Sequence, residues 1–177
     1  LTLSSLNPLP SEAEIVIIGG GIVGCSLAYH LTKRGINDVV LLERKQLTCG
    51  TTWHAAGLVS MLWPTPTLTN LAKYCHELYA TLEEETGQAT GYKQIGSLSL
   101  ARNKERFEEL KRNASMAKVF GVKSEILGPN EICQLYPGLS SEGILGALHI
   151  EKDGQTNPID TTMALAKGAQ NRGAKVI

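Results

Sequence analysis

The sequence predicts an α/β fold in which a parallel sheet is interrupted by an inserted antiparallel region. Two observations predict it. A short apolar strand, a glycine-rich turn, a helix and a second apolar strand follow one another over residues 13–43, which is the order of a βαβ unit. More than a hundred residues then intervene before another helix and strand, over residues 158–177. We expect this last pair to return to the first sheet, which the chain leaves incomplete.

The first strand leads into a glycine pattern that is typical of dinucleotide-binding turns. Residues 14–18 (EIVII) form a short run rich in β-branched side chains, which favours a strand buried on both faces. The pattern G-x-G-x-x-G follows at Gly19, Gly21 and Gly24. In such turns the first glycine allows the tight bend and the second lets the backbone approach a pyrophosphate. The third lets the helix pack closely against the strand.

The helix and strand that follow complete this pattern. The helix begins with free N–H groups at Ile22 and Val23, whose partial positive charge favours a diphosphate. Strand 39–42 then ends at Glu43, which lies 43 − 24 = 19 positions after Gly24. This is close to the roughly 20-residue offset of an acid that accepts hydrogen bonds from a ribose diol. The alternative is a βαβ unit whose glycines only ease packing, and the ordered succession of all five features favours dinucleotide binding.

A long connection without periodicity follows, from Arg44 to Gly57. Its small and hydroxyl-bearing residues include Gly50, Thr51, Thr52, Ala55, Ala56 and Gly57. Eleven positions separate Glu43 from His54, so an extended chain of about 36 Å could run from the ribose to the far end of a dinucleotide. The small residues would let the backbone pass close to a flat ring, and the two threonines add hydroxyl donors.

Composition argues against several other classes of function. Lys and Arg together number 17, as do Asp and Glu, so no net charge favours nucleic acid or an anionic membrane as a partner. No apolar run approaches the roughly 18 residues that span a bilayer, and residues 1–12 resemble a loose lead-in without signal-peptide features. The four cysteines are widely spaced and form no C-x-x-C pair, which indicates reduced thiols and neither a disulfide framework nor a metal site.

The remaining elements are predicted from periodicity and capping residues. We expect helices over residues 67–85, 103–121, 129–136 and 157–173, and strands over 96–100, 125–127, 144–150 and 174–177. Asn103 and Asn157 are the expected N-caps of two of these helices. The apolar face of helix 67–85 would contain Leu68, Leu71, Ala72, Cys75, Leu78, Tyr79 and Leu82.

Several stretches together resemble the flavin-dependent dimethylglycine and sarcosine dehydrogenases, a family within the D-amino-acid oxidase superfamily. The matching stretches are IIGGG at 17–21, LLER at 41–44, GTTWHAAGL at 50–58, LEEETG at 82–87, and Asp153-Gly154 with Pro158. Residues 52–57 (TWHAAG) are the most specific of them, because many nucleotide enzymes share the glycine pattern.

The resemblance implies a set of cofactor contacts. It implies FAD as the cofactor, joined covalently through its 8α-methyl carbon to His54. It also implies FAD contacts at Ile22, Val23, Glu43, Arg44 and the loop from Gly50 to Leu58. Trp53 would either stack near the flavin or fill the core, and the sequence favours neither.

The resemblance further implies an enzyme and a domain order. Such enzymes oxidise an N-methyl amino acid, release formaldehyde or pass the carbon to tetrahydrofolate, and send electrons to an electron-transfer flavoprotein. We expect a lead-in over 1–12, the first part of the FAD-binding domain over 13–95, part of a substrate domain over 96–157, and a return to the FAD-binding domain over 158–177. The chain resembles the front part of such an enzyme, so we assign no catalytic residue and expect those groups beyond Ile177.

Two alternatives remain open. One is a related oxidase that reduces oxygen and binds FAD without a covalent bond. The other is a non-catalytic regulatory subunit like the one that resembles this family and controls pyruvate dehydrogenase phosphatase, which lacks the histidine found here as His54. The sequence does not separate sarcosine from dimethylglycine as substrate, nor the mitochondrial matrix from the bacterial cytoplasm as location.

Overall fold

The computed structural model describes residues 9–177, so the first eight positions of the predicted lead-in lie outside the described residues. The described chain forms two compact units. The first unit comprises the residues up to Gly57 together with 78–92 and 156–177, and the second comprises 58–77 and 93–155. Helix α2 (Pro66–Thr86) contributes residues to both.

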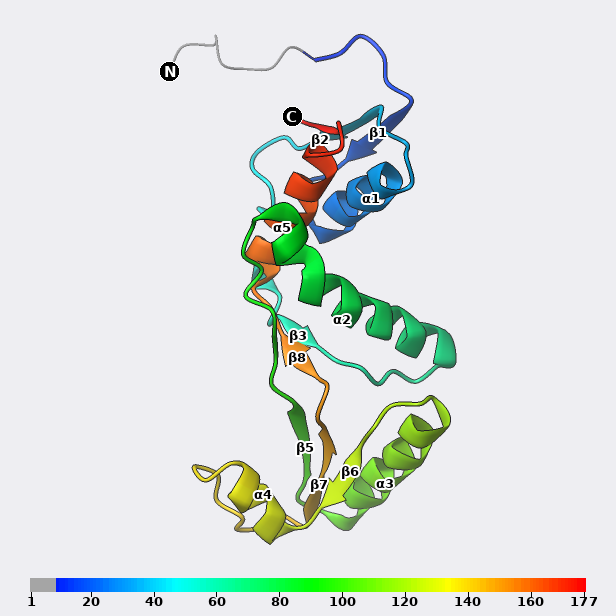
Figure 1. Ribbon diagram of the computed structural model, residues 1–177. Coiled ribbons are helices and arrows are strands. Elements are labelled where there is room, and N and C mark those ends of the chain that lie inside the picture. Colours follow the sequence, from blue (N-terminus) through cyan, green and yellow to red (C-terminus); the bar gives the residue numbers. More distant parts are fainter. Residues whose placement is uncertain (1–8) are drawn as a thin grey trace. The chain divides into compact units, whose positions relative to one another are not determined.

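The first unit is built on a parallel sheet. Its strand order is β1 (Ile15–Ile18), β2 (Val39–Leu42), β9 (Lys175–Val176), with Ile17 opposite Leu41 and Leu41 opposite Val176. Helices α1 (Ile22–Lys33) and α5 (Pro158–Gln170) pack beside one another in this unit (Figure 1). The predicted return of the last helix and strand to the first sheet is therefore confirmed, as is the predicted fold class.

One expectation for this sheet was wrong. Strand β1 was predicted to be buried on both faces, and Ile17 is indeed only 6% exposed, but Val16 is 53% and Ile18 87% exposed. Strand β1 lies at the edge of the sheet, and no element of the described chain covers the face that carries these two side chains. Strand β2, in the centre, is the one buried on both faces, at Val39, Val40 and Leu41.

Small residues let helices α1 and α5 approach closely. A Cβ atom added at Gly168 of α5 would lie 2.8 Å from the ring of Tyr29 in α1, so the close packing requires glycine there. The predicted cap of α5 is confirmed, because the Asn157 side chain accepts hydrogen bonds from the N–H groups of Ile159 (3.0 Å) and Asp160 (3.3 Å).

A polar network joins the last turn of α2 to α1 and α5. The hydroxyl of the buried Tyr29 donates to both oxygens of Glu85, at 2.8 and 2.7 Å. Arg172 pairs with the same carboxylate, and the Lys33 ammonium lies 3.7 Å from it. A carboxylate at the C-terminal end of a helix opposes the helix dipole, so these donors stabilise Glu85 where the helix itself does not.

The second unit contains two antiparallel sheets. The larger has the order β5 (Ser97–Ala101), β7 (Gly146–Ile150), β6 (Glu125–Leu127), close to the predicted strands. The smaller has the order β3 (Leu58–Val59), β8 (Gly154–Gln155), β4 (Lys93–Gln94), and the sequence did not predict any of its strands.

Helices cover both faces of the larger sheet (Figure 1). Helix α3 (Lys104–Val119) packs Leu110 and Ala117 against Leu148 and Ile150, and α4 (Pro129–Leu135) packs its side chains on the opposite face. The predicted cap of α3 is confirmed, because the Asn103 side chain accepts a hydrogen bond from the Arg106 N–H at 2.8 Å.

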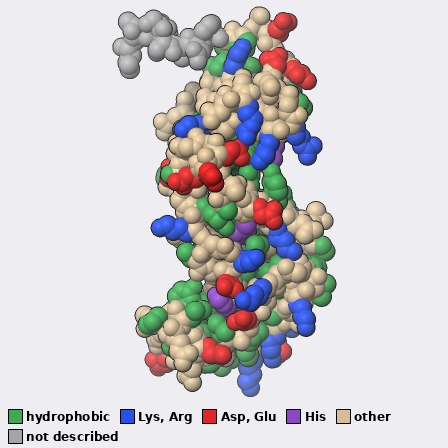
Figure 2. Space-filling view, viewed as in Figure 1, with side chains coloured by type: hydrophobic (Ala, Val, Ile, Leu, Met, Phe, Trp, Pro, Cys, Tyr) green, Lys and Arg blue, Asp and Glu red, His purple; other side chains and the backbone are tan. Residues whose placement is uncertain are grey.

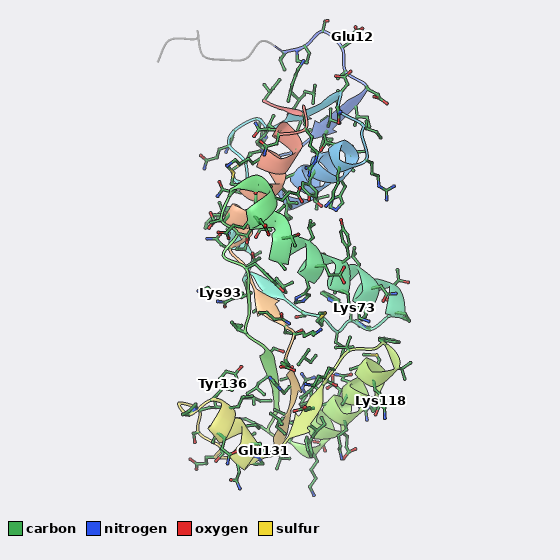
Figure 3. All side chains as sticks on the ribbon, in the orientation of Figure 1. Glu12, Lys73, Lys93, Lys118, Glu131 and Tyr136 are labelled. Atoms are coloured by element: carbon green, nitrogen blue, oxygen red, sulfur yellow. The ribbon has the colours of Figure 1, made fainter. Side chains whose placement is uncertain are left out.

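A lysine of α2 caps the C-terminal end of α3. The ammonium of Lys73, labelled in Figure 3, donates to the carbonyl of Phe120 at 2.6 Å, just after the last residue of α3. A cation at this position satisfies a carbonyl that has no partner inside the helix.

The buried face of α2 matches the predicted one only in part: Ala72, Leu78 and Leu82 are buried as predicted. Leu68 and Leu71 are 43% and 58% exposed, whereas Thr69 is fully buried and His76 is 5% exposed. The Thr69 hydroxyl donates to the carbonyl of Trp63 at 3.1 Å and accepts from its N–H at 3.2 Å. A polar side chain that completes two backbone hydrogen bonds can replace an apolar one in the core, which periodicity of hydrophobicity does not detect.

Acidic and basic side chains are interspersed on the face shown in Figure 2. Of the helices between residues 9 and 177, none combines the length and the apolar character needed to cross a lipid bilayer.

Candidate functional site

The turn after β1 requires glycine at several positions, for reasons of backbone conformation or of space. Gly19 has φ +111°, a conformation that favours glycine. A Cβ at Gly24 would lie 2.0 Å from the Gly19 carbonyl oxygen, and one at Gly20 would lie 2.4 Å from the side chain of Leu47. The turn and the first turn of α1 therefore touch through backbone atoms, and helix α1 starts directly against the strand.

Glu43, at the end of β2, is bound to this turn. Its Oε2 accepts the N–H of Gly20 at 2.8 Å, and its Oε1 accepts the N–H of Lys45 at 3.1 Å. The first of these bonds, more than the second, holds the pKa of the Glu43 carboxyl below its ordinary value, so the group is ionised at neutral pH. The Cys49 thiol also donates to Oε1, at 3.7 Å. A carboxylate has about four acceptor positions, so Glu43 keeps one for a ribose hydroxyl.

The hydrogen bond from its N–H to Glu43 gives Gly20 a role that the G-x-G-x-x-G pattern does not predict. The three consecutive glycines at 19–21 were available as a pattern, but only two of them belong to G-x-G-x-x-G. The middle glycine presents its N–H to the acid and, having no side chain, lets the connection after β2 pass close by.

The first N–H groups of α1 are divided between two uses. The N–H of Ile22 donates to the Thr52 hydroxyl at 3.0 Å, although the sequence assigned it to a diphosphate. The N–H groups of Gly21 and Val23 have no acceptor within residues 9–177. Two donors at the positive end of the helix thus stay open for an anion.

A cleft of about 770 Å³ lies along β1 and the start of α1. It is lined by Ile15, Val16, Ile17, Ile18, Gly19, Gly21, Ile22, Val23, Gly24, Leu27, Thr51, Thr52 and Ala55. Apolar side chains of the strand and the helix form much of its wall, and the glycine turn and the threonines supply polar groups. Such a mixed lining suits a ligand with flat rings and a diphosphate.

The structure brings half of the predicted site residues into this cleft. Of those residues, the lining includes Gly19, Gly21, Ile22, Val23, Gly24, Thr51, Thr52 and Ala55. It does not include Glu43, Arg44, Gly50, Trp53, His54, Ala56, Gly57 or Leu58. Arg44 and Gly50 are exposed on the connection, and Leu58 begins β3 in the second unit.

His54 ends a short 3₁₀ helix, η2 (Thr52–His54). Its side chain is exposed, and its ring lies 3.8 Å from that of Trp53 with an interplanar angle of 35°. Trp53 is 54% exposed, so it does not fill the core of the unit. The imidazole is thus presented to solvent two residues beyond a threonine that is anchored to α1.

The connection is anchored again at Gly57. The Thr156 N–H donates to the Gly57 carbonyl at 2.8 Å. Gly57 has φ +74°, and a Cβ there would lie 2.1 Å from the Thr156 carbonyl oxygen, so only glycine fits. In the described part of the chain, no three His, Cys, Asp or Glu side chains are grouped so that they could hold a metal ion.

Comparison with known proteins identifies the family. Residues 14–177 match the family model described as FAD dependent oxidoreductase. The chain belongs to this family. Crystallised L-proline dehydrogenase from P. horikoshii has the same fold, with a TM-score of 0.88 and 32% identity over 96% of this chain and 44% of that one.

Curated relatives of this FAD-dependent oxidoreductase chain are longer proteins. It is 45% identical to mitochondrial sarcosine dehydrogenase of Homo sapiens over 97% of this chain and 19% of that protein. It is 46% identical to mitochondrial dimethylglycine dehydrogenase of Rattus norvegicus, over 94% and 20%. It is also 40% identical to the mitochondrial pyruvate dehydrogenase phosphatase regulatory subunit of Mus musculus, over 95% and 19%. The chain thus spans about a fifth of these relatives, and the resemblance to the two dehydrogenases is confirmed.

The residues present fit the cofactor of this FAD-dependent oxidoreductase family. A Cβ at Gly24 would meet the Gly19 carbonyl oxygen and one at Gly20 would meet the Leu47 side chain, so glycine at both positions keeps the turn close to α1 and to the connection after β2. The open N–H groups of Gly21 and Val23 suit the diphosphate, and the ionised Glu43 suits a ribose hydroxyl.

Proposed function

We propose that the protein containing this chain is an FAD-dependent enzyme that oxidatively demethylates an N-methyl amino acid, sarcosine or dimethylglycine. The relatives named sarcosine dehydrogenase and dimethylglycine dehydrogenase support this substrate class. The observation that carries the proposal is the cleft beside the first turn of α1, where open N–H groups, a buried threonine and apolar walls meet. In the proposal, residues 13–95 and 158–177 belong to the FAD-binding domain and 96–157 to part of the substrate domain.

In this proposal each site residue has a defined task. The N–H groups of Gly21 and Val23 receive the diphosphate, and Glu43 accepts a hydrogen bond from the ribose. Arg44 and the segment 50–58 follow the cofactor toward its ring system. The FAD that these residues would hold would supply the hydride acceptor for oxidation of the substrate's N-methyl group.

His54 forms the covalent bond to the 8α-methyl carbon in the same proposal. Forming this N–C bond removes one hydrogen from the imidazole and one from the methyl group. These leave as two protons and two electrons, and an external acceptor such as oxygen takes up the electrons. A covalent bond prevents loss of the cofactor and makes it a stronger oxidant.

The later steps involve groups that we place outside residues 1–177. The oxidised substrate gives up its methyl carbon as formaldehyde or to tetrahydrofolate, and an electron-transfer flavoprotein receives the electrons. The catalytic residues and the amine pocket are proposed to lie outside residues 1–177 as well. The mitochondrial relatives support the mitochondrial matrix as one location. A further relative, 4-methylaminobutanoate oxidase (formaldehyde-forming) of Paenarthrobacter nicotinovorans, is 42% identical over 99% of this chain and supports the bacterial cytoplasm as the other.

A non-catalytic regulatory subunit is the second candidate function. The 40% identity to the pyruvate dehydrogenase phosphatase regulatory subunit favours it. The presence of His54 argues against it, because the resemblance implies that this subunit lacks the histidine. Turnover of sarcosine or dimethylglycine by the full-length protein would eliminate it. Hydrogen peroxide formed in equal amount with product would instead identify an oxidase.

The direct test is mass spectrometry of the denatured full-length protein. We expect an FAD adduct on the peptide that carries His54 and loss of that adduct in His54→Ala. His149→Ala, which changes a histidine of the second unit, should retain it. Release of all flavin on denaturation would contradict the covalent bond and leave FAD binding itself intact.

A further inference from the structure

We propose that Thr52 is a positioning residue, which fixes the turn carrying His54 against the first turn of α1 and so sets the place of the imidazole. The inference rests on the proposed function, because the position of His54 matters chemically only if its side chain bonds to the cofactor. It assigns Thr52 a task different from cofactor contact, namely the placement of a neighbouring side chain.

Thr52 is buried, unlike the residues on either side of it in the sequence. Thr52 is 8% exposed, whereas its neighbours at 50, 51 and 53–56 are all exposed. Its hydroxyl accepts the Ile22 N–H at 3.0 Å. Within residues 9–177 this is the one hydrogen bond that joins segment 50–56 to the rest of the first unit.

The first turn of α1 is shaped to receive this hydroxyl. A Cβ added at Gly21 would lie 3.1 Å from the Thr52 oxygen, so the glycine leaves the hydroxyl room close to the backbone. The Ile22 N–H belongs to the first turn of a helix, where backbone donors have no partner inside the helix. Thr52 therefore satisfies a donor that the helix cannot, and a threonine without its hydroxyl would leave that donor unpaired.

The turn that carries His54 has little stability of its own. Two backbone bonds hold η2, from His54 N–H to the Thr51 carbonyl and from Ala55 N–H to the Thr52 carbonyl, both at 3.1 Å. An isolated turn of this length is not stable without contacts to its surroundings. It is held at one end by Thr52 and beyond its other end by the bond between Gly57 and Thr156. His54 lies between these anchors.

Thr52 and the diphosphate would use different N–H groups of α1, so a Thr52 variant should affect covalent attachment and FAD binding differently. Gly21 and Val23 N–H groups, which stay open for the diphosphate, do not depend on Thr52. Loss of the hydroxyl should therefore slow formation of the bond at His54 more than it weakens FAD binding. An ordinary hydrogen bond corresponds to a factor of up to about tenfold in an equilibrium or rate.

The experiment compares full-length proteins expressed under riboflavin depletion and then incubated with FAD. Covalent attachment is followed by mass spectrometry of samples denatured at intervals, over a range of FAD concentrations. Thr52→Val replaces the hydroxyl by a methyl group of similar size, and Thr52→Ser keeps the hydroxyl. Thr67→Val makes the same chemical change at an exposed position outside the cleft.

We expect Thr52→Val to lower the attachment rate at saturating FAD about tenfold, with Thr52→Ser and Thr67→Val within about twofold of the unmodified protein. If Thr52→Val fails to fold, Thr52→Ala is compared with Thr52→Ser, because these two differ only in the hydroxyl. An unchanged saturating rate, or a change confined to the FAD concentration that gives half the maximal rate, would overturn the positioning role and leave the proposed function standing. Absence of any adduct in the unmodified protein would overturn the positioning role together with the covalent bond at His54, and would leave non-covalent FAD binding standing.

Discussion

Glu43 in the first unit and Asp153 in the second make similar hydrogen bonds and differ in exposure. Each carboxylate accepts a backbone N–H from a segment distant in sequence, Glu43 from Gly20 at 2.8 Å and Asp153 from Met61 at 2.6 Å. Asp153 is 5% exposed and also accepts the Ser97 hydroxyl at 2.5 Å, so both of its oxygens are engaged inside the protein. Glu43 is only partly buried.

This difference separates a structural carboxylate from a binding one. A buried carboxylate must have its hydrogen bonds satisfied by the protein itself, because an unpaired one is strongly destabilising. A partly exposed carboxylate held by two backbone donors is fixed in place and still open to a ligand. We therefore assign Asp153 to the architecture of the second unit, whereas Glu43 is the carboxylate that the proposed function gives to the cofactor.

The largest effect is expected from Asp153→Ala. The change leaves the Met61 N–H and the Ser97 hydroxyl without their acceptor, and hydrogen bonds to a charged group contribute about 1.5–3 kcal/mol each. We expect the free energy of unfolding, measured with urea, to fall by about 3 kcal/mol. Asp153→Asn keeps one acceptor oxygen and should cost less. Equal stability of Asp153→Ala and the unmodified protein would remove the distinction between the two carboxylates.

Gly24→Ala tests the other side of the comparison, the glycine turn to which Glu43 is bound. The added methyl group would lie 2.0 Å from the Gly19 carbonyl oxygen, and backbone must move to accommodate it. We expect a loss of about 2 kcal/mol in unfolding free energy together with weaker FAD retention. Gly138→Ala is the control, because a Cβ there meets no atom within 4 Å.

Much of this architecture was predictable because its determinants are local. The βαβ unit and the caps at Asn103 and Asn157 depend on residues a few positions apart, and periodicity or capping chemistry detects them. The small sheet was missed because its strands contain two residues each and pair Leu58 with Gln155, far apart in sequence. A two-residue strand has no period of its own.

The candidate site likewise contains features with local determinants, which the sequence predicts, and features that depend on residues far apart in sequence. The glycines and Glu43 follow a fixed spacing, so the sequence alone could predict them as site residues. The bond between Ile22 and Thr52 joins residues 30 positions apart and diverts a donor that spacing alone assigned to the ligand. The exposure of Ile18 depends on which element covers an edge strand, and composition of the strand does not report that.

A smaller effect, on binding and not on folding, is expected from Glu43→Gln. In the His54→Ala background, where FAD is not tethered, we expect about tenfold weaker FAD binding by equilibrium dialysis, because a charged acceptor to the ribose is lost. Unfolding free energy should change less than in Asp153→Ala. A Glu43→Gln protein that binds FAD as tightly as its parent would show that the acid is not part of the site.

The pH dependence of binding follows from the same residue. The Gly20 and Lys45 N–H groups lower the pKa of Glu43, so its contribution is present above the ordinary value of 4.5 and is lost as the pH falls through the lower folded pKa. With Glu43 present, FAD binding in the His54→Ala background should therefore stay constant from pH 8 to about 5 and decline only in more acidic solution. The decline assigned to this group should be absent in Glu43→Gln.

The smallest effect is expected from Tyr29→Phe. This change removes a hydrogen bond to a third carboxylate, Glu85, which is partly exposed like Glu43 and engaged by side chains of the protein like Asp153. Glu85 resembles Asp153 in being engaged by the protein, but its partners include Arg172 and Lys33 as well as the Tyr29 hydroxyl. Burial acts to raise the pKa of Glu85, and the hydrogen bonds from Arg172 and Tyr29 with the nearby positive charges outweigh it, so the pKa is lowered. The phenylalanine ring keeps the packing against Gly168 and removes one donor of several.

The unfolding free energy of Tyr29→Phe, measured with urea at pH 7, should therefore fall by about 1 kcal/mol, less than for Asp153→Ala, because two cations remain beside Glu85. The loss should diminish below the ordinary pKa of 4.5, since the stabilisation from an acid with a lowered pKa disappears as that acid is protonated. A loss as large as that of Asp153→Ala would mean that the neutral donor, and not the charged partners, holds the end of α2.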